Sequence, residues 1–383
     1  MERATPREKL PPELTDMVID QFYLSDESDG DMVRALRTCS LVCRAWLPRC
    51  RAMLFRSIAA DDAFMEPLER LLRDSPHLGQ YVKELELIMS KNKHVALLYS
   101  IAGHLGAVVK FGLTWRAPSP PRVRSLSSIG HVSTLCLDGN ISSLLELVEY
   151  FEAFPKSNNI TIDLNFTNAL MDDNAALHTL ADALCKLHPE RIQVADSTAV
   201  LLTACLRLRP DTGVREIDCV PLEDGRWGCL DELLPAAASS MQTFGFAITA
   251  GWDSPKDVVE DLYKLNATLR TCSELRRLSF YIHTAHIGFI AELFSHLIES
   301  QVRSVEVVVD FEVNPIPLLD IKYIAQALDN KRSFPILRDI RILVRGYPDV
   351  DRWRLIAILQ GLRSTFFSAM EARGISVLLE HEI

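Results

Sequence analysis

One spacing of apolar residues, apolar-x-x-apolar-x-apolar, recurs along most of this chain and limits the folds open to it. The last two apolar positions of each copy have a single residue between them, which is typical of a short β-strand with one buried face. Clear copies begin at Val82, Val108, Val132, Val214, Met241, Leu275, Val302 and Leu337. Weaker copies at Ile160, Ile192 and Ile375 fill the gaps and restore steps of about 22 to 38 residues.

Amphipathic stretches with helical spacing lie between these predicted strands. Examples are Phe64 to Arg73, Ser142 to Phe154, Ala175 to Leu187, Pro255 to Leu269, Ile287 to Ile298 and Ile321 to Leu328. Strand and helix therefore alternate, and right-handed crossovers between successive strands give a parallel sheet. We expect an α/β fold with about ten or eleven strands, which is too many for an eight-stranded barrel.

The copy at residues 132–140 resembles the leucine-rich repeat. Val132, Leu135, Leu137 and Asn140 match the consensus L-x-x-L-x-L-x-x-N almost fully. Elsewhere the consensus asparagine is replaced by Ser90, Arg116, Leu222, Thr249, His283, Asp310 and Arg345. The resemblance implies an irregular, leucine-rich-repeat-like α/β solenoid. A three-layer α/β domain with coincidental spacing remains the alternative, because alternating apolar strands satisfy either fold.

Charge and cysteine usage narrow the classes of partner and compartment. The 383-residue chain has a formal net charge of −10, and a surface of that sign repels phosphate backbones, so we expect no nucleic-acid partner. Nine cysteines are scattered without the dense spacing of a secreted scaffold, which indicates reduced thiols. Residues 1–9 lead into no apolar signal segment, and proline and polar residues interrupt the longest uncharged window, Leu233 to Trp252. We expect an intracellular protein, cytoplasmic or nuclear, without a membrane span.

Residues 10–58 differ from the rest of the chain in the order of their charges. Seven acidic residues and no basic ones lie between Leu10 and Asp31, and six arginines and no acidic residues lie between Met32 and Ile58. Antiparallel packing of these two segments would bring opposite charges together. Each exposed ion pair contributes only about 0 to 1 kcal/mol, so the charges support such packing without proving it.

Three short helices are predicted in this segment. The first begins at Pro11 and Pro12, whose missing N–H groups cost nothing in a first turn. Its apolar stripe comprises Leu14, Met17, Val18 and Phe22, with Ile19 on the flank. The second helix carries Leu36, Cys39, Cys43, Trp46 and Cys50. Pro48 should break it, and the third helix should follow with Met53, Leu54 and Ile58 on its inner side. Such a small unit buries little apolar surface, so we expect it to need a partner.

The same segment resembles an F-box, in the form common among fungal proteins. The resemblance is carried by Leu10-Pro11-Pro12-Glu13-Leu14, Val18-Ile19, Leu36, Leu41-Val42-Cys43-Arg44, Trp46 and Leu54-Phe55. In that family three helices bind the small Skp-family adaptor that links substrate receptors to a cullin ubiquitin ligase. The resemblance implies adaptor contacts at Leu10, Pro11, Leu14, Val18, Ile19, Leu36, Val42 and Trp46.

The link between the first two helices departs from the family pattern, because it is long and acidic, from Ser25 to Asp31. We interpret it as a solvated loop, with a phosphorylation switch at Ser25 or Ser28 as the alternative. For the whole helical segment, the alternative to an F-box is a cap that covers the end of a repeat array.

The motifs that anchor common enzyme sites are missing from the sequence. It contains no G-x-S-x-G, no G-x-x-x-x-G-K-[ST] and no G-x-G-x-x-G. Cys39 and Cys43 lack the further ligands of a metal site, so we interpret them as buried thiols. His283 and His286 are interpreted as loop residues at the entry to a helix. We expect no catalytic residues, no metal and no cofactor.

Two further groups of residues have a structural interpretation. The carboxylates of Asp61-Asp62 and of Asp172-Asp173 precede apolar helical stretches and are expected to cap them. The tryptophans outside the helical segment are expected to pack in the core rather than to anchor a partner; they are Trp115, Trp227, Trp252 and Trp353.

The predicted organisation is a tail at residues 1–9, the F-box helices at 10–58 and a leucine-rich-repeat-like recognition domain at 60–383. By resemblance, the chain is expected to be the substrate-recognition adaptor of an SCF-type cullin-RING ubiquitin ligase, binding a Skp-family adaptor and an unidentified target protein. Two alternatives stay open. One is an F-box or repeat scaffold that acts outside a ligase, and the other is an α/β hydrolase or transferase with unrecognised motifs.

Overall fold

A computed structural model describes most of the chain. The described residues are 12–24, 29–91, 93–116, 121–122, 126–166, 168–219, 228–248, 264–283, 287–297, 300–310, 321–345 and 352–382. Within them, no helix is both long enough and apolar enough to cross a membrane.

The described residues fold as an α/β structure around a parallel sheet of twelve strands, and these strands lie in the order in which they occur along the sequence. They are β1 Ser57–Ala60, β2 Glu84–Met89, β3 Lys110–Trp115, β4 Thr134–Asn140, β5 Asn159–Asn165, β6 Arg191–Val194, β7 Glu216–Cys219, β8 Thr243–Ile248, β9 Arg277–His283, β10 Ser304–Asp310, β11 Asp339–Arg345 and β12 Ser376–Glu382. The α/β class and the parallel sheet expected from the sequence are confirmed.

Helices separate most of the strands. They are α1 Pro12–Leu24, α2 Asp29–Ser40, α3 Leu47–Leu54, α4 Met65–Asp74, α5 Lys93–Ala102, α6 Leu144–Ala153, α7 Asn174–Leu187, α8 Asp196–Leu208, α9 Gly228–Ala237, α11 Ile287–His296, α12 Ile321–Leu328, α13 Arg352–Leu362 and α14 Ser368–Ala372. Short 3-10 turns lie at η1 Pro76–Tyr81, η3 Asn168–Asp172 and η4 Pro210–Thr212, and a π-helical turn, η8 Arg363–Phe367, joins α13 to α14. Of the predicted helix from Pro255 to Leu269, residues 255–263 lie outside the described residues. Residues 264–269 are described and are helical.

The recurring apolar pattern marks eleven of these strands, β2 to β12. The three positions of each clear copy are buried throughout, from Val82 in the first copy to Ile342 in the last. The exception is β1, which the sequence did not predict. Only Ala60 of its four residues is fully buried, so β1 lacks the apolar triplet that reveals the other strands.

Residues 1–138 form one compact unit, with α1 to α5 and strands β1 to β3. Its strands pair in register, with Ile58 of β1 beside Leu85 of β2 and Leu85 beside Phe111 of β3. At the start of β2, the main-chain N–H groups of Lys83 and Glu84 donate to the carbonyl oxygen of Arg56. These bonds tie the segment that follows α3 to the sheet.

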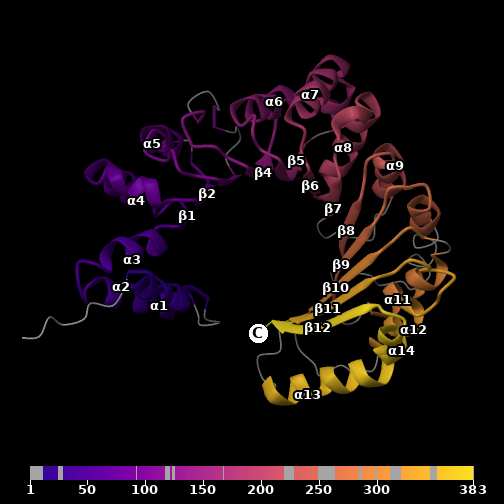
Figure 1. The fold of residues 1–383 in the computed structure, drawn as a ribbon. Coiled ribbons are helices and arrows are strands. Elements are labelled where there is room, and N and C mark those ends of the chain that lie inside the picture. The colour runs from indigo at the N-terminus through magenta and orange to yellow at the C-terminus, as the bar shows by residue number, and fades with distance from the viewer. Residues whose placement is uncertain are drawn as a thin grey trace, which may run out of the picture. The chain divides into compact units, whose positions relative to one another are not determined.

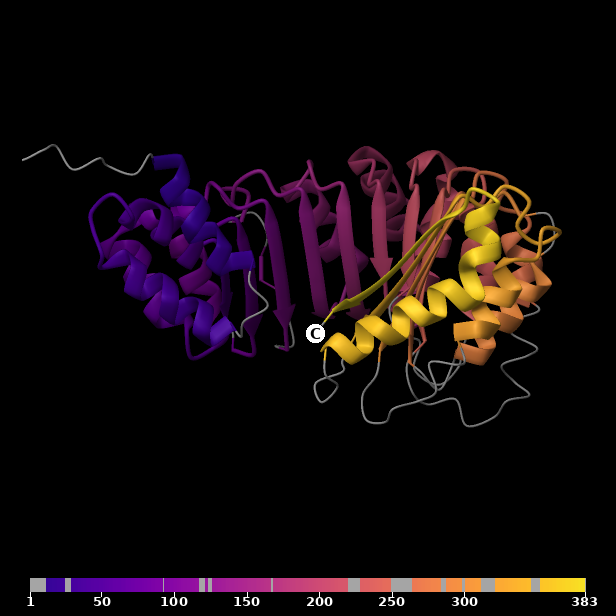
Figure 2. The same ribbon diagram turned by 60° about the horizontal axis from the view of Figure 1, so that its bottom comes forward.

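Residues 139–383 form a second compact unit, and β4 crosses the boundary between the two. Strands β5 to β12 of this unit lie side by side, and helices α7, α8, α9, α11 and α12 cover one face of them (Figure 1, Figure 2). The pattern residues form buried rows across the strands. One row runs through Ile192, Ile217, Phe244, Leu278, Val305, Ile340 and Val377. Between sheet and helices, successive aromatic contacts connect Phe246, Phe280, Phe294 and Phe334.

Candidate functional site

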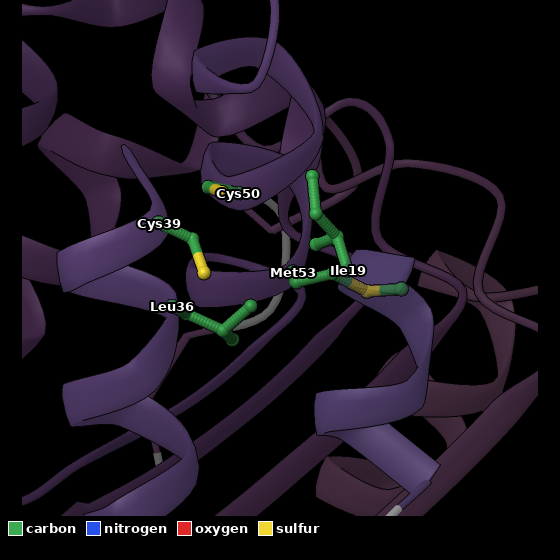
Figure 3. Packing of buried hydrophobic residues seen from close by; sticks show 5 residues of the cluster. All are labelled: Ile19, Leu36, Cys39, Cys50 and Met53. Carbon is green, nitrogen blue, oxygen red and sulfur yellow. The ribbon is translucent and has the colours of Figure 1, made fainter. Parts of the chain in front are cut away.

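Helices α1, α2 and α3 enclose a small apolar core. Its members are Ile19 from α1, Leu36 and Cys39 from α2, and Cys50 and Met53 from α3 (Figure 3). Met32, Trp46 and Leu54 pack against this core and are only partly buried. The core is too small to use all the apolar side chains of the segment, and several of them remain in solvent.

Five large apolar side chains in this segment are exposed. Leu14 is 48% exposed, Met17 60% and Val18 45%, all on α1, while Leu41 at 85% and Val42 at 60% lie in the turn after α2. The described residues contain thirteen exposed large apolar side chains in all, so this short stretch holds more than a third of them. A contiguous patch of exposed apolar side chains is typical of an interaction surface, so this segment is the candidate site.

The two faces of α1 explain this exposure. Thr15 and Ile19, four residues apart, face the other helices and are buried. Leu14 and Val18 are also four residues apart and so share a second face. Residues 14 and 15 differ by about 100° around a helix, so burial of one pair turns the other pair towards solvent.

The predicted adaptor contacts therefore divide into groups. Leu14, Val18 and Val42 are exposed, Trp46 is half-buried, and Ile19 and Leu36 are fully buried in the helical core. In this conformation the two buried residues hold the helices together and are not accessible to a partner. Leu10 and Pro11 lie outside the described residues, as does the side chain of Phe22.

The second and third helices differ from their prediction. Helix α2 ends at Ser40 and α3 begins at Leu47, so Cys43 and Trp46 lie in the turn between them and not on one long helix. Hydrogen-bonded turns at residues 41–46 replace the helix, with Val42 N–H donating to the Cys39 carbonyl and Trp46 N–H to the Cys43 carbonyl. The apolar spacing of one long helix is similar to that of two helices joined by a turn. The sequence pattern therefore did not distinguish these two structures.

Two boundaries of the helical segment are also corrected. Ile58 belongs to strand β1 and not to the third helix. The acidic link is shorter than expected, because Asp29, Gly30 and Asp31 already form the first turn of α2.

One ion pair confirms that the acidic and basic segments pack together. Arg49 of α3 donates from Nε and Nη2 to the two carboxylate oxygens of Asp20 on α1, at 2.7 and 2.5 Å. These hydrogen bonds raise the pKa of Arg49 above its ordinary value. The bidentate geometry makes this a strong and directional contact between α1 and α3.

The cysteines and histidines singled out in the sequence form no metal site in the described part of the chain, where no group of three or more metal-ligating side chains occurs. Cys39 and Cys50 are buried, and burial raises the pKa of the Cys50 thiol. Cys43 is exposed, so its interpretation as a buried thiol was wrong. His283 ends strand β9 instead of lying in a loop, and His286 is outside the described residues.

The capping prediction is correct for some of the four aspartates. Asp173 caps α7 by accepting from Ala176 N–H at 3.0 Å, whereas Asp172 ends a 3-10 turn. Asp61 accepts from Ala63 and Phe64 N–H groups just before α4. Among the tryptophans, Trp115 is buried as expected, and the side chains of the other three lie outside what the structure describes.

Asp62 has a different role, which the sequence did not reveal. Its carboxylate accepts from the hydroxyl and the N–H of Ser90, which follows β2, and lies 2.6 Å from Nδ1 of the buried His94 on α5. Burial raises the pKa of Asp62, but the hydrogen bonds from Ser90 and His94 outweigh it and lower that pKa to about 2. Ser90 and His94 both bond to one carboxylate, so the three do not form a serine–histidine–aspartate relay.

Comparisons with known proteins do not assign the chain to a family. No protein-family model matches the chain, and no curated protein is similar to it in sequence.

Replacement of Ile19 by Ala tests the division of α1 into a buried and an exposed face. The change leaves a cavity among α1, α2 and α3, so it should lower the free energy of unfolding by about 2 to 5 kcal/mol. Met17→Ala is the control, because Met17 lies on the exposed face of α1 and is 60% exposed. This change should alter the free energy of unfolding by less than about 0.5 kcal/mol. Urea unfolding followed by circular dichroism measures both, and equal effects would contradict the assignment.

The Asp62 cluster predicts a dependence of stability on pH. The folded state holds the carboxylate at a pKa of about 2, below the ordinary value of 3.8. The contribution of this carboxylate to the free energy of unfolding should therefore be complete above about pH 4 and be lost as the pH falls towards 2. Asp62→Asn should be less stable than wild type at neutral pH, and the difference should shrink in acid. Urea midpoints between about pH 5 and pH 2 measure this, with the exposed Asp74→Asn as the control that should follow wild type.

Proposed function

We propose that this chain is the substrate-recognition adaptor of an SCF-type cullin-RING ubiquitin ligase. Helices α1 to α3 act as an F-box that binds a Skp-family adaptor, and the repeat body binds a target protein. The observation that supports the proposal is the exposure of Leu14, Val18 and Val42 on a helical unit with a core of its own; by resemblance, these residues match adaptor-contact positions of the F-box.

The division of roles within the segment supports this assignment. A protein-binding unit needs some apolar residues to hold its helices together and others to remain exposed for the partner. Ile19 and Leu36 serve the first purpose, and Leu14, Val18 and Val42 are available for the second. A simple terminal cap would be expected to present a polar outer face, and the exposed apolar side chains of α1 and of the turn after α2 do not fit that role.

The rest of the fold supports a repeat body. In a leucine-rich-repeat-like solenoid, each strand pairs with the strands of the preceding and following repeats, so strand order equals sequence order. The observed sheet has this order, and the parallel register places equivalent pattern residues side by side. The one-sided covering of β5 to β12 by helices is the arrangement that leaves a strand face for recognition (Figure 1).

The proposed mechanism is proximity. The chain holds a target lysine near a ubiquitin-charged enzyme and so raises the effective concentration of the reacting groups, without bond chemistry of its own. Two surfaces are required, one for the adaptor and one for the target, and they can be tested separately.

A single charge in the exposed face of α1 tests the adaptor surface. Val18→Asp should weaken binding to a purified Skp-family adaptor by about tenfold or more, because a carboxylate would be buried in an apolar interface. The matched control is Val200→Asp on α8, since Val200 is 47% exposed and Val18 45%. Affinity is measured by biolayer interferometry with both variants checked for folding.

Three outcomes decide between the candidates. Loss of binding in Val18→Asp alone supports the proposal. No adaptor binding by wild type, or equal loss in both variants, contradicts it. Adaptor binding without assembly of the cullin subunit would favour the scaffold that acts outside a ligase.

A further inference from the structure

The turns that lead into β9, β10 and β11 place three arginines side by side at one end of the sheet. Parallel strands have their first residues at the same end (Figure 2). The carbonyl oxygen of Arg276, directly before β9, accepts from the N–H groups of Arg303 and Ser304 at 2.7 and 3.1 Å. The carbonyl oxygen of Arg303 accepts from Arg338 and Asp339 at 2.8 and 3.0 Å. The main chains of the three arginines are therefore bonded in series, about 4.8 Å apart.

The same kind of bond extends this row to two preceding strands. The N–H of Arg276 donates to the carbonyl oxygen of Gln242 before β8, and the N–H of Gln242 donates to that of Arg215 before β7. We define the arginine row as Arg215, Gln242, Arg276, Arg303 and Arg338. Four of its five positions carry a positive charge, and like charges on neighbouring strands repel one another.

Two adjacent arginines of the row lack an acidic partner. Arg276 pairs with Glu274 at 3.3 Å, whereas neither Arg303 nor Arg338 makes an ion pair within the part of the chain that the structure describes. Both of these side chains are exposed. An anion lying against them would gain charge-assisted hydrogen bonds and relieve the repulsion within the row.

The neighbouring turns add further positive charge. Arg270 before β9 and Lys331 and Arg332 before β11 are exposed. The acidic side chains described in the turns before β9 to β11 are Glu274, paired with Arg276, Asp329, paired with Arg373, and Asp339. Among the described residues, basic side chains therefore outnumber acidic ones at this end of the sheet, although the whole chain has a net charge of −10.

A pocket opens between the turns before β9 and β10. It has a volume of about 300 Å3, and its lining includes Leu269, Leu275, Leu297 and Val302, with Arg270 and Ser273 among its polar members. Leu275 and Val302 directly precede Arg276 and Arg303 in the sequence, so the pocket adjoins the arginine row. The pocket can therefore accept an apolar side chain of a ligand that also contacts the arginines.

Hydrogen bonds between successive turns hold this end of the sheet together. Asn266 Nδ2 and Arg270 Nη2 donate to the carbonyl oxygen of His296 at 2.6 and 3.0 Å. Ser300 donates from its N–H and its hydroxyl to the carbonyl oxygen of Ser333 at 3.1 and 2.8 Å. The surface is therefore preorganised, which lowers the entropy lost when a partner binds.

We infer that the arginine row and the adjoining pocket bind a segment of a target protein that carries carboxylates beside one large apolar side chain. The carboxylates lie against Arg303 and Arg338, and the apolar side chain enters the pocket. The inference rests on the proposed function, because it names the chemistry of the target segment that the repeat body recognises.

Two observations select this occupant. The unpaired arginines favour an anion, and the pocket lined by leucine and valine favours a protein side chain. A single-stranded nucleic acid fits less well, because its bases stack on aromatic side chains and the described lining of the pocket has none.

Binding of short labelled peptides to the full-length chain, without any adaptor, tests this inference. The probe has glutamates on both sides of a central leucine. One counterpart has glutamine in place of each glutamate, and another has serine in place of the leucine. Fluorescence anisotropy should show the probe binding about tenfold or more tightly than either counterpart, with an affinity that falls as salt rises from about 50 to 300 mM.

The peptide series contradicts the inference in three cases. These are equal binding of the glutamate and glutamine peptides, equal binding of the leucine and serine peptides, and tighter binding of a single-stranded oligonucleotide than of the probe.

Removal of the two unpaired arginines locates the site. Arg303→Gln with Arg338→Gln should weaken binding of the probe about tenfold. The thermal midpoint should stay unchanged or rise, because no ion pair is lost and repulsion within the row falls. The matched control is Arg70→Gln with Arg73→Gln on α4, which removes the same charge from two exposed arginines of the other compact unit and should leave binding unchanged. Unchanged binding in the first pair, or equal loss in the second, would overturn the inference.

A carboxylate at the pocket provides a second test. Ser273 is exposed and lines the pocket, so Ser273→Glu should repel the probe and weaken its binding. Ser295→Glu on α11, also at an exposed serine, is the control. Retained binding in Ser273→Glu, or equal loss in Ser295→Glu, counts against the inference. The adaptor experiment with Val18→Asp does not involve these residues, so the two proposals can fail separately.

Discussion

Burial of one face of each strand against a helix is the interaction on which the structure depends. The pattern residues of the clear copies from Val82 to Ile342 are buried, and from β5 to β12 the pattern residues lie in registered rows. Each fully buried aliphatic side chain contributes about 1.5 to 3 kcal/mol to the folded state. Because the rows are continuous across parallel strands, each strand relies on its neighbours. The same arrangement uses only one face of the sheet, and the other face is free to carry charge.

The N-terminal helices show the same constraint on a smaller scale. Their core consists of five buried residues with three partly buried neighbours, which leaves Leu14, Val18 and Val42 outside it. Burial of Thr15 and Ile19 leaves the face of α1 with Leu14 and Val18 exposed, and the ion pair between Asp20 and Arg49 adds a further contact between α1 and α3. Covering these exposed apolar side chains would remove them from water and stabilise a complex, which is the property expected of a docking unit.

The sequence predicted the features that have a strong period and missed those that depend on contacts between distant residues. The triplet at Val305 and Val307 reveals a strand because both residues face the core, whereas β1 offers only Ala60 and gives no such signal. The turn at residues 41–46 was read as helix, because its apolar spacing is compatible with both. The exposed state of Val18 and the buried state of Ile19 could not be told apart, since both are aliphatic neighbours on one helix and only packing against α2 and α3 separates them. The hydrogen bonds from Ser90 and His94 to Asp62 join residues about thirty positions apart in the sequence, and no local sequence pattern predicts them.

The proposed function joins an exposed apolar surface on α1 to a target-binding surface in residues 139–383, and the adaptor surface is its central element. Hydrogen–deuterium exchange of the chain, with and without a purified Skp-family adaptor, tests that element most directly. The account predicts slower exchange in residues 12–24 and 41–46 when the adaptor is present, and unchanged exchange in β5 to β12. Unchanged exchange in residues 12–24 at saturating adaptor, or protection confined to the sheet, would contradict it.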